Sequence, residues 1–315
     1  MIKKLTVSAP SHVHVGNIDL NGNFGRVYGT LGFALETPRL IINMEVSEDT
    51  KNTEEIDLYL NLYKQFMNCN KSISAEIISD IPKNVGLGRT TALALSIGYG
   101  LNLLCKKSFE IIELAKIANR GNKNSALGVY SFKYGGFIVD GGVKNNEVAP
   151  IIFRGIMPEN YRAVLALPEK PIKKILEIKR DEDKILSSLP KMDENFVGYL
   201  SRLVLMKILP SFSEGDIKSF GEGIMEFNRS LGKYWNKYQE GIYCCNEVNK
   251  LIEKFSEIGA VCACQSSWGP TTYGIFNYKE ANYALNEIRK AIDKIGGGKV
   301  WISKIDNNGA FANIK

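Results

Sequence analysis

The segment Pro82-Lys83-Asn84-Val85-Gly86-Leu87-Gly88-Arg89-Thr90-Thr91, with the apolar run that continues to Cys105, is the part of the sequence that says most about the fold. Gly86 and Gly88 let the backbone turn tightly and approach a ligand without a Cβ atom in the way. The apolar run predicts a buried helix that begins directly after this turn. The first N–H groups of that helix, with the positive end of its dipole, would form an anion site.

The residues after the second glycine fit the same chemistry. Thr90 or Thr91 can cap the helix, and Arg89 would add a planar guanidinium suited to phosphate. An ordinary glycine turn before a buried helix explains these residues as well. The segment is not a P-loop, and the run Gly297–Val300 lacks the final Ser or Thr of that motif. It is not a dinucleotide fingerprint either, because the third glycine is missing.

Strand and helix patterns flank this segment on both sides. Alternating apolar residues around a turn at Asn21–Gly25 predict a strand-rich first half, and a seam at Arg154–Tyr161 separates it from a helix-rich second half. We therefore expect an α+β fold of two domains, 1–157 and 158–315, with the ligand between them. The predicted strands are 2–9, 17–20, 26–28, 31–35, 40–46, 75–79, 135–142, 147–153, 162–167, 261–264, 272–276 and 300–305. The predicted helices are 54–67, 90–105, 109–118, 194–208, 215–231, 243–258 and 279–295, and a charged segment covers 169–184.

A second loop rich in hydrogen-bonding groups, Gln265–Thr272, lies between two apolar strands. Its hydroxyl and backbone N–H groups can form a second anion or sugar site, and Trp268 can wall an aromatic ligand. A plain turn with Trp268 in the core explains the same residues. The candidate binding residues of this loop are Gln265, Ser266, Ser267, Trp268, Gly269 and Thr271.

The only two histidines of the chain, His12 and His14, lie in the run Ser11-His12-Val13-His14-Val15. Strand alternation places both on one face. They can bind a metal or a phosphate, move a proton near neutral pH, or serve the structure alone.

Two acids, Asp19 and Asp140, stand at strand ends beside glycine turns. A hydrated Mg²⁺ held by one or two carboxylates and by substrate phosphates would fit there. Capping of the turns by the same side chains is the alternative.

The composition excludes several classes of protein. With 315 residues, 44% of them hydrophobic and 23% charged, the chain is typical of a globular protein. The net charge of +6 suits anionic ligands, but no basic run is interleaved with aromatics, so nucleic acid is not expected. The longest apolar stretch falls short of the ~20 residues of a membrane span, and the N-terminus lacks the apolar core of a signal peptide. We expect a cytoplasmic protein.

Six cysteines occur and none forms a CxxC pair. Free thiols of a cytosolic protein are the expected state. A zinc site built from Cys244, Cys245, Cys262 and Cys264 is the alternative, although its spacing is poor.

Taken together, these segments resemble the GHMP superfamily, which includes galactokinase, homoserine kinase and mevalonate kinase. The similarity is closer to one branch, the archaeal β-ribofuranosylaminobenzene 5′-phosphate synthases of methanopterin biosynthesis. It is carried, in chain order, by Pro10-Ser11 with His14, Ile18–Gly22, Gly25–Val27, Gly32–Glu36, Gly86–Gly88, Arg120-Gly121, Gly135–Gly142 and Gln265–Thr271.

The resemblance implies a GHMP-type α/β domain followed by a ferredoxin-like domain. It implies a reaction in which phosphoribosyl diphosphate and 4-aminobenzoate or 4-hydroxybenzoate give a β-ribofuranosyl arene 5′-phosphate, CO2 and pyrophosphate, with Mg²⁺ and without ATP. In that reading Gly86–Thr91, with Arg89 and Arg26, stabilises the leaving diphosphate. The loop Gln265–Thr271 binds the 5′-phosphate. The catalytic candidates are His14 (with His12), Arg89 and Asp140. Ser11 and His12 are candidate substrate-binding residues, and Asp19 and Asp140 are candidate metal ligands.

The chain departs from the family pattern at positions expected to touch the ligand. His12 stands where the opening motif of the family is expected to have Arg. Tyr28 and Thr30 replace the Asp and Gly that usually follow Gly-Arg-Val or Gly-Arg-Ile. Arg89 replaces the Ser that is usual after Gly-Leu-Gly. A divergent paralogue with another acceptor therefore remains open, as do an ATP-dependent GHMP kinase and a non-catalytic protein that kept the fold. A homodimer is expected only because symmetric dimers are the commonest soluble assemblies.

Overall fold

The computed structural model describes residues 3–170, 190–239 and 241–314. The chain opens with a long hairpin, in which β1 (Lys4–Asp19) and β2 (Tyr28–Val46) pair antiparallel along most of their length. Of the five short strands predicted between residues 2 and 46, four lie mainly within these two, and the one predicted over 26–28 overlaps β2 only at Tyr28. The register shifts between Pro10 and Ser11 and again between His14 and Gly16. Such bulges re-aim side chains, and both histidines lie between the two shifts.

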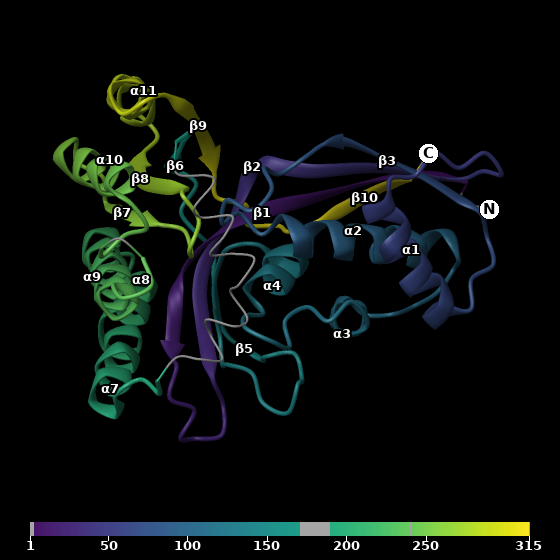
Figure 1. Ribbon diagram of the computed structural model, residues 1–315, viewed down its shortest axis with the longest axis horizontal. Helices are drawn as coiled ribbons and strands as arrows, with labels where there is room; N and C mark the ends of the chain where they lie inside the picture. The colour runs from purple at the N-terminus through teal and green to yellow at the C-terminus, as the bar shows by residue number, and fades with distance from the viewer. Residues whose placement is uncertain (1–2, 171–189, 240, 315) are drawn as a thin grey trace.

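The first sheet has the strand order β10 (Phe311–Ile314), β1, β2, β4 (Phe137–Asp140) and β5 (Ile151–Gly155), and β3 (Ile73–Ser79) also pairs with β2. Figure 1 shows the helices of the first half on one side of the long strands. They are α1 (Glu54–Met67), α2 (Arg89–Leu104), α3 (Ile111–Ile117) and α4 (Leu127–Tyr134). Most residues of α2 are buried, which explains why its sequence is apolar on nearly every face.

The second sheet is antiparallel, with the order β7 (Cys262–Gln265), β8 (Thr272–Asn277), β6 (Tyr161–Pro168) and β9 (Gly298–Lys304). This is the ferredoxin-like arrangement of a β-α-β-β-α-β unit. Between β6 and β7, the described residues form α7 (Glu194–Leu203), the π-helix η1 (Val204–Ile208), α8 (Leu209–Glu214), α9 (Ile217–Trp235) and α10 (Asn246–Glu257). α11 (Ala281–Lys294) connects β8 to β9.

One hydrophobic core joins the two halves. It contains residues of β1, β2 and α2 together with Phe220, Phe227 and Tyr273 of the second half, and Phe33 of β2 contacts Phe220 and Tyr273 edge to face. The packing of α9 on β1 is tight, because a Cβ at Gly16 would clash with Leu231. The halves are therefore held at a fixed angle, so that a site between them can be preorganised.

The predicted α+β class and ferredoxin-like second sheet are confirmed. Two elements, α4 and β10, were not predicted. The helix predicted over 194–208 consists of α7 and η1, and α8 continues it beyond the predicted end. β10 pairs with β1 although it belongs to the second half of the chain. The boundary between residues 157 and 158 stays a prediction. The charged segment predicted over 169–184 lies almost wholly outside the described residues.

The cysteine prediction is wrong for one pair. Cys69 follows α1 and Cys105 follows α2, and the two form a disulfide with Cα atoms 6.1 Å apart. The packing of α1 against α2 brings these helix ends together, which the separation of 36 residues did not reveal. The other four cysteines are buried and lie outside this disulfide, and no set of three metal-binding side chains occurs within the described ranges. In the same part of the chain, no helix is long and apolar enough to span a bilayer.

Candidate active site

The two glycine- and hydroxyl-rich loops, Gly86–Thr91 and Gln265–Thr271, contact each other where the two halves of the chain meet. The Ser266 hydroxyl donates to the Gly86 carbonyl at 2.6 Å and accepts from the His14 N–H at 3.0 Å. The Ser267 N–H donates to the His14 carbonyl at 2.9 Å. A Cβ on Gly86 would collide with the Ser266 carbonyl, so a side chain there would push the loops apart. The two loops predicted from the sequence therefore meet at β1.

A cavity of about 170 Å³ opens where the loops meet. It is built from four separate segments: β1, the loop before α2, the start of α4, and the loop after β7. Its lining residues are His12, His14, Asn17, Gly88, Thr91, Asn124, Ser125, Gly128, Ser267 and Trp268. Six of these, namely His12, His14, Gly88, Thr91, Ser267 and Trp268, were predicted from the sequence.

The N-terminus of α2 faces this cavity through Gly88 and Thr91. Gly88 is the N-cap, with φ +74°, and no side chain caps the helix. Thr90 is exposed and lies outside the cavity lining, so neither threonine has the capping role that we expected. Because the glycine N-cap has no side chain of its own to accept from the first helical N–H groups, this end of α2 can receive an anion.

His12 lies between two glycines of the cavity wall. A Cβ on Gly88 would overlap the His12 ring, and a Cβ on Gly128 would come within 3.0 Å of its Cε1 atom. The His12 N–H also donates to the Leu87 carbonyl at 3.3 Å. Gly88 is therefore required for the imidazole to occupy this place, and a side chain at Gly128 would make the imidazole shift slightly.

Asp140 supports the site from behind. Its buried carboxylate accepts from the N–H groups of Thr30 (3.2 Å), Ala126 (3.0 Å) and Gly142 (3.0 Å) and from the Thr30 hydroxyl. Burial raises the pKa of Asp140, and these donors act against that shift. The carboxylate thus fixes the start of α4, which carries Ser125 and Gly128, and it is enclosed by protein donors rather than open to a metal ion.

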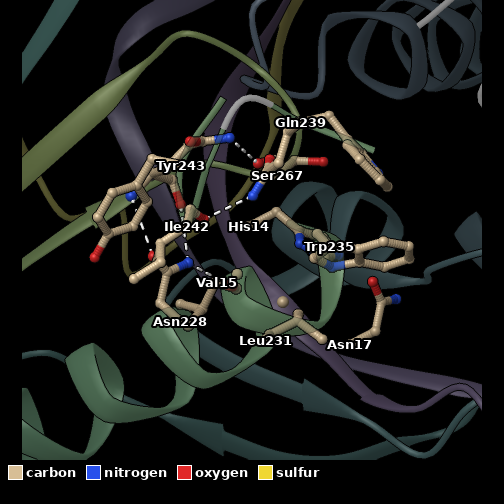
Figure 2. A pocket seen from close by; sticks show the side chains of 14 residues that line it. His14, Val15, Asn17, Asn228, Leu231, Trp235, Gln239, Ile242, Tyr243 and Ser267 are labelled. Carbon is tan, nitrogen blue, oxygen red and sulfur yellow. Dashed lines mark hydrogen bonds between the residues drawn. The ribbon is translucent and has the colours of Figure 1, made fainter. Parts of the chain in front are cut away.

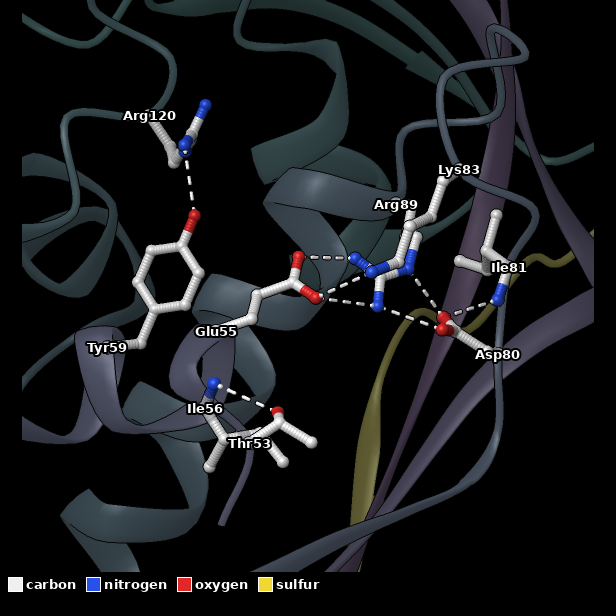
Figure 3. A network of polar contacts seen from close by, with 9 residues as sticks. All are labelled: Thr53, Glu55, Ile56, Tyr59, Asp80, Ile81, Lys83, Arg89 and Arg120. Atoms are coloured by element: carbon white, nitrogen blue, oxygen red, sulfur yellow. Dashed lines mark hydrogen bonds and ion pairs between the residues drawn. The ribbon is translucent and has the colours of Figure 1, made fainter.

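Arg89 points away from the cavity. Figure 3 shows its guanidinium between Glu55 of α1 and Asp80, which follows β3. The Arg89 Nε and Nη2 atoms donate to Asp80 at 2.8 Å each, and Nη1 donates to Glu55 at 2.5 Å. Only 5% of the Arg89 side chain is exposed. The hydrogen bond from Arg89 holds the pKa of Glu55 below its ordinary value, opposed by burial. The geometry gives Arg89 a structural role in place of the expected phosphate contact.

The remaining predicted residues of the hairpin lie outside the cavity lining. One Asp19 oxygen accepts from the N–H groups of Asn21 and Gly22 and so caps the turn. Arg26 donates to the Gly142 carbonyl at 3.1 Å. Ser11 is fully buried in β1.

The rest of the second loop is used internally. The Gln265 carboxamide accepts from the Cys244 N–H and donates to the Ser267 carbonyl. Thr271 is fully buried, and a Cβ on Gly269 would clash with the Val85 carbonyl. Of the candidates in this loop, Ser267 and Trp268 face the cavity, and the others hold the loop against its neighbours.

Sequence reasoning missed Asn17, Asn124, Ser125 and Gly128. The polar run Gly121–Ser125 is a helix-start signal that could have been read, since Asn and Ser favour such positions. Asn17 reaches the cavity because the bulge after His14 shifts the strand alternation by one residue. No sequence pattern marks that shift.

The expected Mg²⁺ ligands do not fit a metal held by protein. Neither Asp19 nor Asp140 lines the cavity, and its described lining contains no carboxylate, lysine or arginine. A metal ion at this site would have to be held chiefly by phosphate oxygens of the substrate and by water.

Comparison with known proteins identifies this architecture. The model of the GHMP kinases N terminal domain matches residues 56–136, and that of the GHMP kinases C terminal matches residues 208–294. Homoserine kinase from Cytophaga hutchinsonii superposes with a TM-score of 0.73 at 18% identity, covering 99% of this chain and 98% of that one. Mevalonate kinase from Methanococcus jannaschii gives 0.63 at 14% identity, covering 96% and 98%. The fold is that of the GHMP class.

Sequence relatives narrow the class. The β-ribofuranosylphenol 5′-phosphate synthase of Archaeoglobus fulgidus is 31% identical over 86% of this chain and 87% of its own length. The enzyme of the same name from Methanothermobacter thermautotrophicus is 29% identical over 99% of both chains. The chain belongs to the β-ribofuranosylphenol 5′-phosphate synthase family within the GHMP superfamily.

Proposed function

We propose that this protein condenses phosphoribosyl diphosphate with a 4-substituted benzoate to give a β-ribofuranosyl arene 5′-phosphate, in methanopterin biosynthesis. The name of its relatives describes a phenol product, which supports 4-hydroxybenzoate as the acceptor over 4-aminobenzoate. The observation that carries the proposal is the convergence of the two loops on one cavity, which is lined by Gly88 and Thr91 at the N-terminus of α2 and by Trp268.

The reaction forms one C–C bond and breaks two bonds. The ring carbon that bears the carboxylate attacks C1 of the ribose, and the C1–O bond to diphosphate breaks with its electron pair leaving on the diphosphate. The bond to the carboxylate carbon then breaks, CO2 departs, and its electron pair restores the aromatic ring. No net proton moves, so the chemistry needs no general base. We therefore assign His14 to orienting the acceptor.

The protein groups at the cavity suit these steps. The open N-terminus of α2 at Gly88–Thr91 can receive the diphosphate as its charge develops. Asn124, Ser125 and Ser267 offer amide and hydroxyl groups to the ribose phosphate, and Trp268 offers an apolar surface to the arene. Enclosure between the halves would exclude water from the oxocarbenium-like centre.

Because no lysine or arginine lines the described cavity, the charge of phosphoribosyl diphosphate needs another counter-ion. We propose that Mg²⁺ enters as part of the substrate complex, where it neutralises the diphosphate. Removal of Mg²⁺ by a chelator should abolish turnover, and added Mg²⁺ should restore it.

A direct assay tests the function. The protein is incubated with Mg²⁺, phosphoribosyl diphosphate and 4-hydroxybenzoate, and pyrophosphate, CO2 and the ribosyl arene are measured. In parallel, the shift of the unfolding temperature with phosphoribosyl diphosphate is compared with that by ATP. We expect products in equal amounts and a shift by phosphoribosyl diphosphate. A shift by ATP alone would favour a kinase, and no shift with either would favour a non-catalytic protein.

We also propose that the protein is cytoplasmic and dimeric. Cell fractionation tests the location, and light scattering tests the dimer.

A further inference from the structure

A second, much smaller cavity lies directly behind the wall of the first. Its volume is about 30 Å³, and it shares His14, Asn17, Ser267 and Trp268 with the larger cavity. Figure 2 shows it between His14 and Ser267 and the side chains of Leu231 and Trp235 from α9, with Ile242 and Tyr243 on the opposite side. The two spaces are thus separated by no more than one layer of side chains.

The walls of the small cavity are tightly packed. The ring centroids of Trp235 and Trp268 lie 4.4 Å apart. A Cβ on Gly232 would collide with the Ile242 carbonyl, which keeps α9 close to the following loop. Asn228 donates to the Val15 carbonyl at 2.7 Å and so ties α9 to β1. Because close-packed walls resist expansion, the size of this cavity can discriminate between ligands.

We propose that the small cavity receives the para substituent of the aromatic acceptor, an inference that rests on the proposed function. The ring would lie beside Trp268 in the larger cavity, with its carboxylate-bearing carbon toward the ribose and its para group directed between His14 and Asn17. A space of about 30 Å³ accepts a hydroxyl or amino group, each with one heavy atom, and a larger para substituent would press against the side chains of Leu231 and Trp235.

The chemistry of the reaction explains why a polar residue should stand at this wall. When the ring carbon attacks the ribose, the para oxygen takes up part of the positive charge, and its O–H becomes a stronger donor. The Asn17 carboxamide, on the wall common to both cavities, can accept that hydrogen bond. A hydrogen-bond acceptor at this position stabilises the reaction intermediate more than it stabilises the unreacted benzoate.

Comparing 4-hydroxybenzoate with 4-methoxybenzoate as acceptors tests the inference. Both donate electrons through an oxygen atom, but the methoxy acid carries one more methyl group and lacks the O–H that would donate to Asn17. We expect kcat/KM for the methoxy acid to be lower by at least about tenfold, the smallest effect typical of one misfitting methyl group. In Leu231→Ala, the ratio of kcat/KM for 4-hydroxybenzoate to that for 4-methoxybenzoate should fall by about tenfold or more, because this substitution enlarges the small cavity.

Ile224→Ala is the matched control, since Ile224 is buried in the same helix but does not line the cavity. It should leave the selectivity unchanged. If Leu231→Ala does not fold, Leu231→Val provides the smaller enlargement. Asn17→Ala should raise KM for 4-hydroxybenzoate at least about fivefold and leave KM for phosphoribosyl diphosphate within twofold.

The outcomes separate the two levels of the proposal. Equal use of both acids by the unmodified protein, or an equal change of selectivity in the control, would overturn the para-substituent site while leaving the synthase activity in place. Absence of product with every acceptor would contradict the proposed function itself.

Discussion

Gly88 meets two demands that only glycine satisfies together. It caps α2 with φ +74°, a conformation that L side chains rarely adopt, and the His12 imidazole occupies the space that a Cβ would need. The missing Cβ atom of Gly88 therefore sets both the geometry of the candidate anion site and the position of His12.

Gly88→Ala should therefore lower kcat/KM by about 100-fold or more, because the added methyl displaces His12 and distorts the first turn of α2. Gly215→Ala is the control. Gly215 has φ +75°, but no atom lies within 4 Å of its added Cβ, so it carries the backbone strain alone. Steady-state kinetics of both variants would show whether the site, rather than strain, is responsible. Equal losses in the two would contradict the account.

Arg89 illustrates how the partner of a residue decides its role. Its side chain pairs with Glu55 and Asp80, so Arg89→Met should lower the free energy of unfolding by about 2 kcal/mol. Below the unfolding temperature, kcat/KM should stay within about tenfold of the original. Urea unfolding and kinetics on one preparation measure both. A loss of activity above 100-fold in a stable protein would return Arg89 to the active site.

At the scale of elements, the two loops act as a pair because Ser266 bonds both β1 and the loop before α2. Ser266→Ala removes these hydrogen bonds and leaves a buried carbonyl and a buried N–H without this partner. We expect KM for phosphoribosyl diphosphate to rise about tenfold.

Thr272→Val serves as the comparison, since it deletes another buried hydroxyl nearby, one that donates to the Ala166 carbonyl in the second sheet. Its KM should stay within about twofold. A larger effect of Thr272→Val than of Ser266→Ala would indicate that general loss of stability, rather than loop pairing, controls binding.

Helices and strands with a strong local sequence pattern could be predicted. Those that are stabilised mainly by packing or pairing with distant segments could not. α1 has amphipathic spacing and a Thr53 cap, and its predicted bounds agree with the structure. α4 contains β-branched, glycine and aromatic residues of low helix propensity, and its buried packing stabilises it instead. β10 is four mostly exposed residues that form a strand only by pairing with β1.

For the whole molecule, the sequence pointed to the correct fold and to three of the four segments at the cavity. It did not reveal which side chains point inward. Ser266 and Ser267 are neighbours with opposite roles, and the orientation of Asn17 depends on a bulge. Arg89 has the composition of a phosphate ligand, but its partners come from 34 and 9 positions away in the sequence.

The ion pairs around Arg89 also make stability depend on pH. The lowered pKa of Glu55 means that its contribution is present above its ordinary pKa of 4.5 and is lost as pH falls through and below that value. The difference in unfolding temperature between the original protein and Glu55→Gln should therefore be largest near pH 7 and shrink below pH 4.5. Glu76→Gln, at an exposed position of β3, is the control. A difference that does not vary with pH would contradict this assignment.

The most direct test of the account is a crystal structure with phosphoribosyl diphosphate and Mg²⁺. We predict the diphosphate at the N-terminus of α2, beside Gly88 and Thr91, with the ribose facing Ser267 and Trp268 between the two halves. Ligand density on any other surface, or contacts with only one of the two loops, would contradict the claim that the loops together form the synthase site.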